Sequence, residues 1–240
     1  HAIEFAGPAI EALEVEGRLT LCNLSVELGA RFGLVAPDER TFDYLRGRPF
    51  APQGADFDAA LAQWRELHSD DGARFDREEV IDAGEVRPTI TWGTSPEHAM
   101  AIGGRVPDPQ AAGSEAQREN LRAALEYMGL APGQEIAGTK VDWVFIGSCA
   151  NARLSDLRAA AEVARGRKVA PGVHAWVVPG SENVKREAEA QGLREVFETA
   201  GFSWREPGCS MCVAANGEQV PPQQRSVSTS NPNFVCPQGS

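Results

Sequence analysis

The segment Val141-Asp-Trp-Val-Phe-Ile146 is a short apolar run that leads into Gly147-Ser-Cys-Ala-Asn151. A helix-like stretch follows from Ser155 to about Arg165. A run of this length and composition predicts a buried strand. Cys149 therefore falls at a strand-to-helix corner, where α/β proteins place their ligand-binding and catalytic groups.

The same alternation continues toward the C-terminus. Beyond the first unit we predict strands at Val173–Val178 and Phe202–Trp204, and helices at Glu182–Gln191 and Leu193–Thr199. Strands that alternate with helices favour a mainly parallel sheet flanked by helices. The sequence thus predicts an α/β fold.

The N-terminal half has a less regular pattern. Its apolar spacing predicts helices from His1 to about Gly17 and from Asp56 to His68, and short strands at Val80-Ile81 and Thr89–Trp92. Residues 105–114 are rich in Gly, Pro and Ala and read as a linker. A helix then runs from Glu115 to Met128 and stops at Gly129, a good C-terminal cap. We therefore expect one α/β domain in residues 1–104 and a second in residues 115–240.

A second pair of cysteines lies in Pro207-Gly-Cys-Ser-Met-Cys212, a tight loop from which two thiolates can reach one metal centre. Together with Cys149, three thiolates from two loops suit an iron–sulfur cluster in which one iron has no protein ligand. Such an iron can act as a Lewis acid. The spacing alone also fits half of a structural zinc site, a redox dithiol or two thiols without a role. Zinc would need a fourth ligand, and His174 is the one histidine close to these cysteines in sequence.

Composition and charge exclude some classes of partner. The 240 residues carry a net charge of −11, which argues against binding to nucleic acid or to anionic membrane surfaces. No apolar run is long enough to cross a bilayer. The five cysteines are an odd number in a chain too large to need disulfides, so we expect reduced thiols and a cytoplasmic location. Cys22 is predicted to be a buried core thiol, and Cys236 has no assigned role.

Several motifs resemble one family. They are Glu16-Gly-Arg-Leu-Thr-Leu-Cys-Asn23, Gly33-Leu-Val-Ala-Pro-Asp-Glu39, Thr91-Trp-Gly-Thr-Ser-Pro96, Gly147-Ser-Cys-Ala-Asn-Ala-Arg153, Val178-Pro-Gly-Ser181, Pro207-Gly-Cys-Ser-Met-Cys212 and Ser228-Thr-Ser-Asn231. The chain resembles the C-terminal half of the large subunit of isopropylmalate isomerase (3-isopropylmalate dehydratase), in the aconitase superfamily of hydro-lyases. The resemblance implies aconitase-like α/β/α layers, incomplete relative to the full large subunit.

The resemblance also implies a site and its partners. Cys149, Cys209 and Cys212 would be the ligands of a [4Fe-4S] cluster that dehydrates and rehydrates a hydroxy-di-acid. Asn23 and Glu27 fall where the family has an Asn and a Glu lining the cluster pocket. Arg153 and Asn231 would bind the substrate. The family's large subunit works with a separate small subunit, so the implied assembly is a heterodimer or larger.

The chain departs from the family pattern at its C-terminal end. Two arginines of the family fall on Pro232 and Pro237, and its glycine falls on Cys236. Proline carries neither charge nor a hydrogen-bond donor. We therefore expect no isomerase turnover by this chain alone. The alternatives are a non-catalytic iron–sulfur or metal-binding module and a related hydro-lyase that acts on another hydroxy-di-acid.

Overall fold

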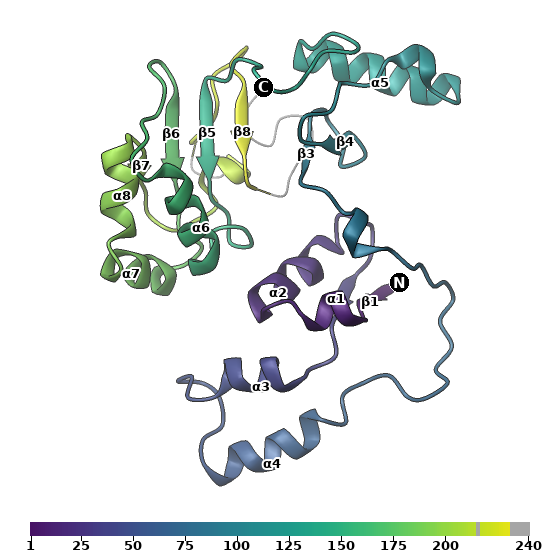
Figure 1. The fold of residues 1–240 in the computed structure, drawn as a ribbon, viewed down its shortest axis with the longest axis vertical. Helices are drawn as coiled ribbons and strands as arrows, with labels where there is room; N and C mark the ends of the chain where they lie inside the picture. The colour runs from purple at the N-terminus through teal and green to yellow at the C-terminus, as the bar shows by residue number, and fades with distance from the viewer. Residues whose placement is uncertain (215–216, 231–240) are drawn as a thin grey trace. The chain divides into compact units, whose positions relative to one another are not determined.

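The computed structural model describes residues 1–214 and 217–230, so Asn231, Pro232, Cys236 and Pro237 lie outside the described residues. Internal contacts divide the chain between Glu85 and Val86 into two compact units, and each is described by itself (Figure 1). The domain limits drawn from the sequence, with a linker at residues 105–114, stay a prediction. Within the described part, every helix is too short or too polar to cross a membrane.

The N-terminal unit combines short helices with a two-stranded sheet. Its elements are β1 (Ala2–Glu4), α1 (Pro8–Glu11), α2 (Val15–Leu24), β2 (Phe32–Leu34), α3 (Glu39–Leu45), α4 (Ala55–Trp64) and the 3-10 turn η1 (Ala83–Glu85). Strands β1 and β2 pair in parallel, with Ile3 opposite Gly33. Gly33 is required there because a Cβ would lie 2.9 Å from the Cα of Cys22. The helix predicted over residues 1–17 is wrong, since its first part is a strand.

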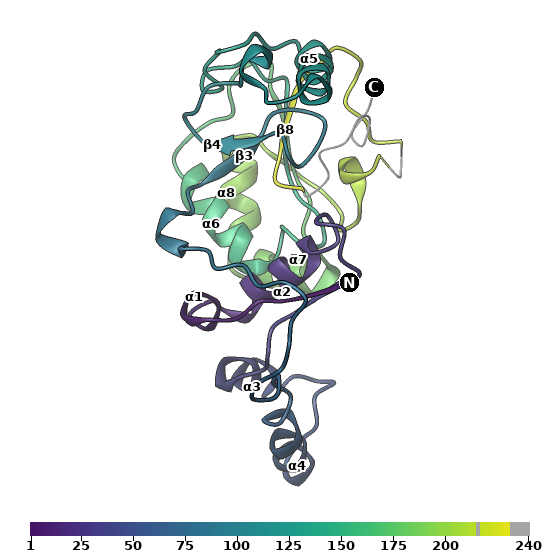
Figure 2. The same ribbon diagram turned by 90° about the vertical axis from the view of Figure 1, so that its right-hand side faces the viewer.

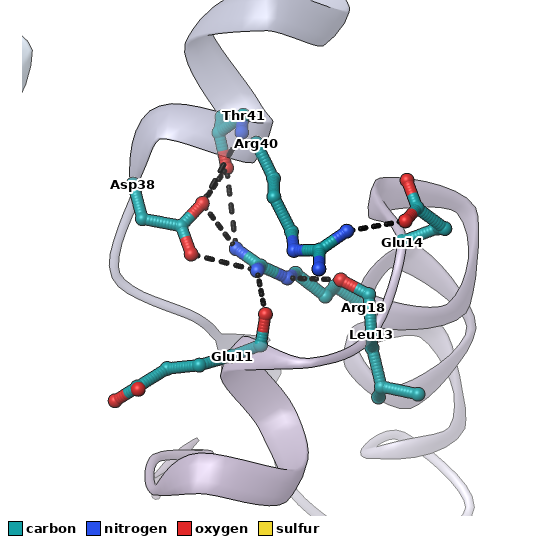
Figure 3. Close-up of polar contacts among 7 residues, drawn as sticks. All are labelled: Glu11, Leu13, Glu14, Arg18, Asp38, Arg40 and Thr41. Atoms are coloured by element: carbon teal, nitrogen blue, oxygen red, sulfur yellow. Dashed lines mark hydrogen bonds and ion pairs between the residues drawn. The ribbon is translucent and has the colours of Figure 1, made fainter.

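Arg18 joins three segments of the N-terminal unit (Figure 3). Its side chain is 5% exposed, and its guanidinium donates two hydrogen bonds of 2.7 Å to the Asp38 carboxylate. It also donates to the carbonyl oxygens of Leu13, at 3.0 Å, and Glu11, at 2.8 Å. Asp38 is itself the N-cap of α3, since it accepts a hydrogen bond of 3.2 Å from the backbone N–H of Thr41. One ion pair thus fixes α2, α3 and the turn after α1.

The C-terminal unit begins with a hairpin and a long helix. Strands β3 (Thr89–Thr91) and β4 (Ala99–Ala101) pair antiparallel, and the 3-10 turn η2 (Pro109–Ala111) leads to α5 (Glu115–Met128). Ser114 caps the start of α5, and Gly129 ends it in the left-handed conformation, as predicted. Trp92 and Val106 pack against Ala124, Leu125 and Leu130 to form the core of this part.

A four-stranded parallel sheet with the strand order β7-β6-β5-β8 follows (Figure 1), and Figure 2 shows the same ribbon turned by 90°. Its strands are β5 (Trp143–Ile146), β6 (His174–Val177), β7 (Ser203–Trp204) and β8 (Ser226–Ser228), and the connecting helices are α6 (Leu154–Ala164), α7 (Glu182–Ala190) and α8 (Leu193–Ala200). The α/β fold is confirmed, and each predicted helix and strand of this alternation is present within two residues of its expected ends. Strand β8 was not predicted.

Side chains of the sheet alternate between two cores. Ile146 and Val177 pack against α6, α7 and α8, where Leu157 and Phe197 are fully buried. Phe145, the neighbour of Ile146 along β5, packs instead with Val178, Met211 and Val220 on the other face. This period of two is what a strand buried on both faces requires. The second face is therefore covered by the loop that carries the cysteine pair.

The Arg18–Asp38 pair should control the stability of the N-terminal unit. We expect Arg18→Ala to lower the free energy of unfolding by about 2 to 3 kcal/mol, less than for a fully buried pair because Asp38 is 36% exposed. Arg77→Ala is the matched control, since Arg77 and its partner Glu79 are both largely exposed and the pair contributes little. Urea titration measures both variants. Equal losses in the two variants would contradict this role of Arg18.

The same pair should give the unit a pH dependence. Hydrogen bonds from Arg18 hold the pKa of the Asp38 carboxyl below its ordinary value of 3.8. A depressed folded-state pKa stabilises the folded chain above the unfolded value and loses that contribution as the pH falls through the folded value. The stability difference between the wild type and Asp38→Asn should therefore be largest above about pH 5 and shrink below 3.8. Denaturation at a series of pH values measures it, and a difference that does not change with pH would refute it.

Candidate functional site

The parallel sheet gathers the cysteine loops at one edge. Cys149 lies three residues after the end of β5, and Cys209 lies five residues after the end of β7. The carboxyl ends of parallel strands lie at the same edge of a sheet, so both loops leave from the same side. The segment after β8, which begins with Thr229, leaves from that edge as well.

The turn that carries Cys149 is held by the end of β8. Ser148 is buried and has a φ of 101°, a left-handed conformation that is unfavourable for a residue with a Cβ. The backbone N–H of Gly147 donates to Thr229 Oγ1 at 3.1 Å, and Asn151 Nδ2 donates to the Thr229 carbonyl oxygen at 2.6 Å. Ser148 Oγ accepts from the backbone N–H of Asn151 at 3.1 Å. These contacts fix the direction in which exposed Cys149 leaves the sheet.

The loop of the second pair is a short 3-10 turn, η3 (Ser210–Cys212). The backbone N–H of Cys212 donates to the Cys209 carbonyl oxygen at 2.8 Å, which closes the turn. Met211 is fully buried against Phe145 and Val178 and anchors the turn to the sheet. Cys209 remains exposed and Cys212 is half-buried. The turn thus buries the residues between the cysteines and leaves the thiols near the surface.

Electrostatics connect the three thiols. The pKa of Cys212 is raised, first by burial and then by the negative charges of Cys149 and Cys209, while a hydrogen bond with Ser230 acts in the opposite direction. Because both charges act on Cys212, Cys149 lies in the neighbourhood of the pair although about sixty residues separate them in sequence. The thiol form of Cys212 is therefore favoured, whereas a bound cation would favour its thiolate.

The three thiols have the donor chemistry of an iron–sulfur cluster, in which cysteine thiolates bind the irons. Among residues 1–214 and 217–230, no three His, Cys, Asp or Glu side chains are arranged to hold one metal ion. A four-iron cluster binds its cysteines through different irons, so the three thiols need not converge on one point. Cys149 and Cys209 are exposed, and Cys212 is half-buried. The residues present thus fit a cluster with three cysteine ligands.

Other residues singled out from the sequence have separate positions. Arg153 is half-buried at the N-cap of α6, where its backbone N–H donates to Asp156 at 3.0 Å. Asn23 is exposed and Glu27 is half-buried in the N-terminal unit. The Glu27 Oε2 atom is buried without a hydrogen-bond partner in the described part of the chain, which is uncommon for a structural carboxylate. Cys22 is half-buried, although it was predicted to be fully buried, and burial raises its pKa.

Sequence reasoning missed the hydroxyl groups that support the cysteines. Ser148, Thr229 and Ser230 hold the first turn or contact Cys212. The available signal was the run Ser228-Thr-Ser230, three hydroxyl residues in succession before the end of the matched motif. Its position beside β5 could not be derived without knowing that β8 pairs there.

Comparisons with known proteins identify the family of this chain. A family model described as the aconitase family (aconitate hydratase) matches residues 1–240, and the chain belongs to that family. It is 67% identical over 239 residues to 3-isopropylmalate dehydratase large subunit 1 of Bradyrhizobium diazoefficiens. The alignment covers 100% of this chain and 50% of the relative. The chain thus spans half the length of the curated relative that it matches.

Gly147 should be essential for the turn that carries Cys149. A Cβ at this position would lie 2.4 Å from the ring of Phe145, which is fully buried. We expect Gly147→Ala to cost about 1 to 3 kcal/mol of stability through overpacking. Gly113→Ala is the matched control, because its Cβ would meet only the end of the Gln117 side chain at 3.4 Å. Thermal unfolding measures the stability of the two variants. A Gly147→Ala protein as stable as the wild type would contradict the close packing.

Proposed function

We propose that this chain is the cluster-binding part of the large subunit of a 3-isopropylmalate dehydratase. The observation that carries the proposal is the placement of Cys149, Cys209 and Cys212 at one edge of the parallel sheet, where the first and second act electrostatically on the third. The 67% identity to a protein of that name supports the choice of branch within the family. The reaction would interconvert 2-isopropylmalate and 3-isopropylmalate, a step of leucine biosynthesis, by dehydration and rehydration.

The three cysteines would hold a [4Fe-4S] cluster. When bound, such a cluster supplies an iron without a protein ligand, which is a Lewis acid that helps a hydroxyl group to leave. The chain's own contribution is the geometry of the two turns: the Thr229 contacts fix Cys149, and buried Met211 fixes the pair. The free thiols of the described cysteines are consistent with the reducing conditions of the cytoplasm.

Polar side chains would bind the di-acid and take part in its reaction. An arginine fork binds a carboxylate through two hydrogen bonds, which is the role we assign to Arg153, with Asn231 as a second contact. Glu27, whose buried Oε2 has no partner in the described part of the chain, is the proposed catalytic carboxylate, and Asn23, four residues earlier in the sequence, is a second catalytic candidate. The half-length of the chain relative to its match leaves room for further groups in a longer protein, and a small subunit would complete the assembly.

A second candidate is an iron–sulfur module without hydro-lyase activity. The observation that favours it is the pair Pro232 and Pro237, which stand where the family has arginines. Two missing guanidinium groups would leave the charges of a di-acid without partners. In that case the chain would bind a cluster but not the substrate.

Cluster binding can be tested directly by reconstitution. Anaerobic treatment of the chain with ferrous iron and sulfide should give the broad visible absorption of an iron–sulfur cluster, with iron and sulfide bound in equal amounts. Cys149→Ser, Cys209→Ser and Cys212→Ser should each abolish it, because every variant removes one of three ligands. Cys22→Ser is the matched control and should retain full absorption. Loss of the signal in the control, or its persistence in the three variants, would overturn the assignment.

Arginine replacement separates the two candidate functions. Pro232→Arg and Pro237→Arg together should improve the binding of isopropylmalate by orders of magnitude in a chain supplied with the remaining parts of the enzyme, since buried carboxylates without partners are costly. Calorimetry measures the affinity. Tight binding by the unmodified assembly would show that the two arginines are dispensable, and would remove the reason for the second candidate.

A further inference from the structure

We propose that Arg205 and Glu218 are positioning residues that set the direction of the Cys209 and Cys212 thiols. This inference rests on the proposed function, because it takes the two cysteines as cluster ligands. Neither residue belongs to the cysteine motif, and neither was selected from the sequence. They are connected to the motif through Ser210, the residue that follows Cys209.

Ser210 is the point at which the two residues act on the turn. It is 3% exposed and has a φ of 44°, so its backbone adopts a left-handed conformation that is unfavourable for a side chain with a Cβ. Its hydroxyl group donates a hydrogen bond to Glu218 Oε2. A turn with an unfavourable backbone needs such an outside contact to stay in place. Without this hydrogen bond to Glu218, the Ser210 hydroxyl group has no other polar contact among those described.

Arg205 connects the same carboxylate to the sheet. Its guanidinium donates to Glu218 Oε1 and lies 4.2 Å from the centre of the Trp176 ring. Its backbone N–H donates to the Val177 carbonyl oxygen at 2.9 Å. Trp176 and Val177 belong to β6, the strand between those that precede the two cysteine loops. The sequence of contacts from β6 through Arg205 and Glu218 to Ser210 thus fixes the turn relative to the sheet.

The charges in this connection balance each other beside the two cysteines. Glu218 brings a negative charge to a turn whose cysteines become anions when they bind metal. Arg205 balances that charge, since the two side chains form an ion pair in which Glu218 is 23% exposed and Arg205 is 37% exposed. Residues that orient metal ligands through hydrogen bonds commonly alter metal affinity by about tenfold to a hundredfold when they are replaced. Arg205 and Glu218 have the geometry of such residues.

The test compares Glu218→Gln, Arg205→Gln and Ser210→Ala with Glu206→Gln. Glu206 is a matched control because it is adjacent to Arg205 in sequence but pairs with Lys185, at 2.6 Å, and lies 79% exposed. Each reconstituted chain is treated with an iron chelator, and the loss of visible absorption is followed at a temperature well below unfolding. We expect cluster loss to be about tenfold to a hundredfold faster in the first three variants and unchanged in the control. The electron paramagnetic resonance spectrum of the reduced cluster should shift in the same three.

A second measurement needs no cluster. In the metal-free chain, alkylation of Cys209 and Cys212 by iodoacetamide should change in the three variants, while Cys149 and Cys22 react as in the wild type. Peptide mass spectrometry reads each cysteine separately, so a general loss of stability, which would affect every thiol, is distinguished from a local effect on the turn. Ser210→Ala removes only a hydroxyl group and keeps the test valid if a charge variant does not fold.

The outcomes separate this inference from the proposed function. Cluster uptake by the wild type, with unchanged chelator kinetics and alkylation in all three variants, would overturn the role of Arg205 and Glu218 and leave the cluster in place. Failure of the wild type to take up a cluster would overturn the proposed function. In that case selective changes at Cys209 and Cys212 would still support control of the turn, and uniform reactivity of all thiols would refute it.

Discussion

Parallel pairing of β5 with both β6 and β8 is the constraint on which the candidate site depends. The register places Phe145 opposite Trp176 on one side and Ser228 on the other, so three chain segments end at the same level of the sheet. From that level Gly147 hydrogen-bonds to Thr229, 82 residues away in sequence. A shift of register by one residue would turn Phe145 to the face of α6 and α8 and remove the apolar surface that buries Met211. Backbone pairing therefore determines where the cysteine loops leave the sheet.

Both cysteine turns combine an unfavourable backbone with a specific support. Ser148 precedes Cys149, Ser210 follows Cys209, and both serines are buried with positive φ. Glycine would adopt this conformation without cost, but it has no hydroxyl group with which to accept from Asn151 or donate to Glu218. Serine at these positions thus has a less favourable backbone conformation than glycine would have, but it makes side-chain hydrogen bonds that glycine cannot make. Strained residues that persist at functional sites commonly have such compensation in their surroundings.

Helices and strands that are defined by local sequence signals were predicted well from the sequence. Helix α5 has a serine cap, a periodic apolar face and a terminal glycine, all of which are local signals. Strands β5 and β6 are apolar runs that need no knowledge of their neighbours. Strands β1 and β8 were missed because each is three residues long and exists only through pairing with a distant strand. Val80 and Ile81 show the opposite error: their composition favours a strand, yet both are exposed and unpaired in the described structure.

In the candidate site, too, local motifs could be found from the sequence, whereas contacts that depend on strand pairing could not. Motif matching selected Cys149, Cys209 and Cys212, but the contacts that fix them come from Thr229, Ser230, Arg205 and Glu218, whose importance depends on the strand order. Charge adds a final constraint. In a chain with a net charge of −11, burial raises the pKa of Cys212, and the negative charges of Cys149 and Cys209 act in the same direction. Without metal, Cys212 therefore favours its thiol form, whereas metal binding requires the thiolate. Iron bound at the proposed site would supply positive charge there, so assembly of the proposed cluster and ionisation of its cysteines would occur together.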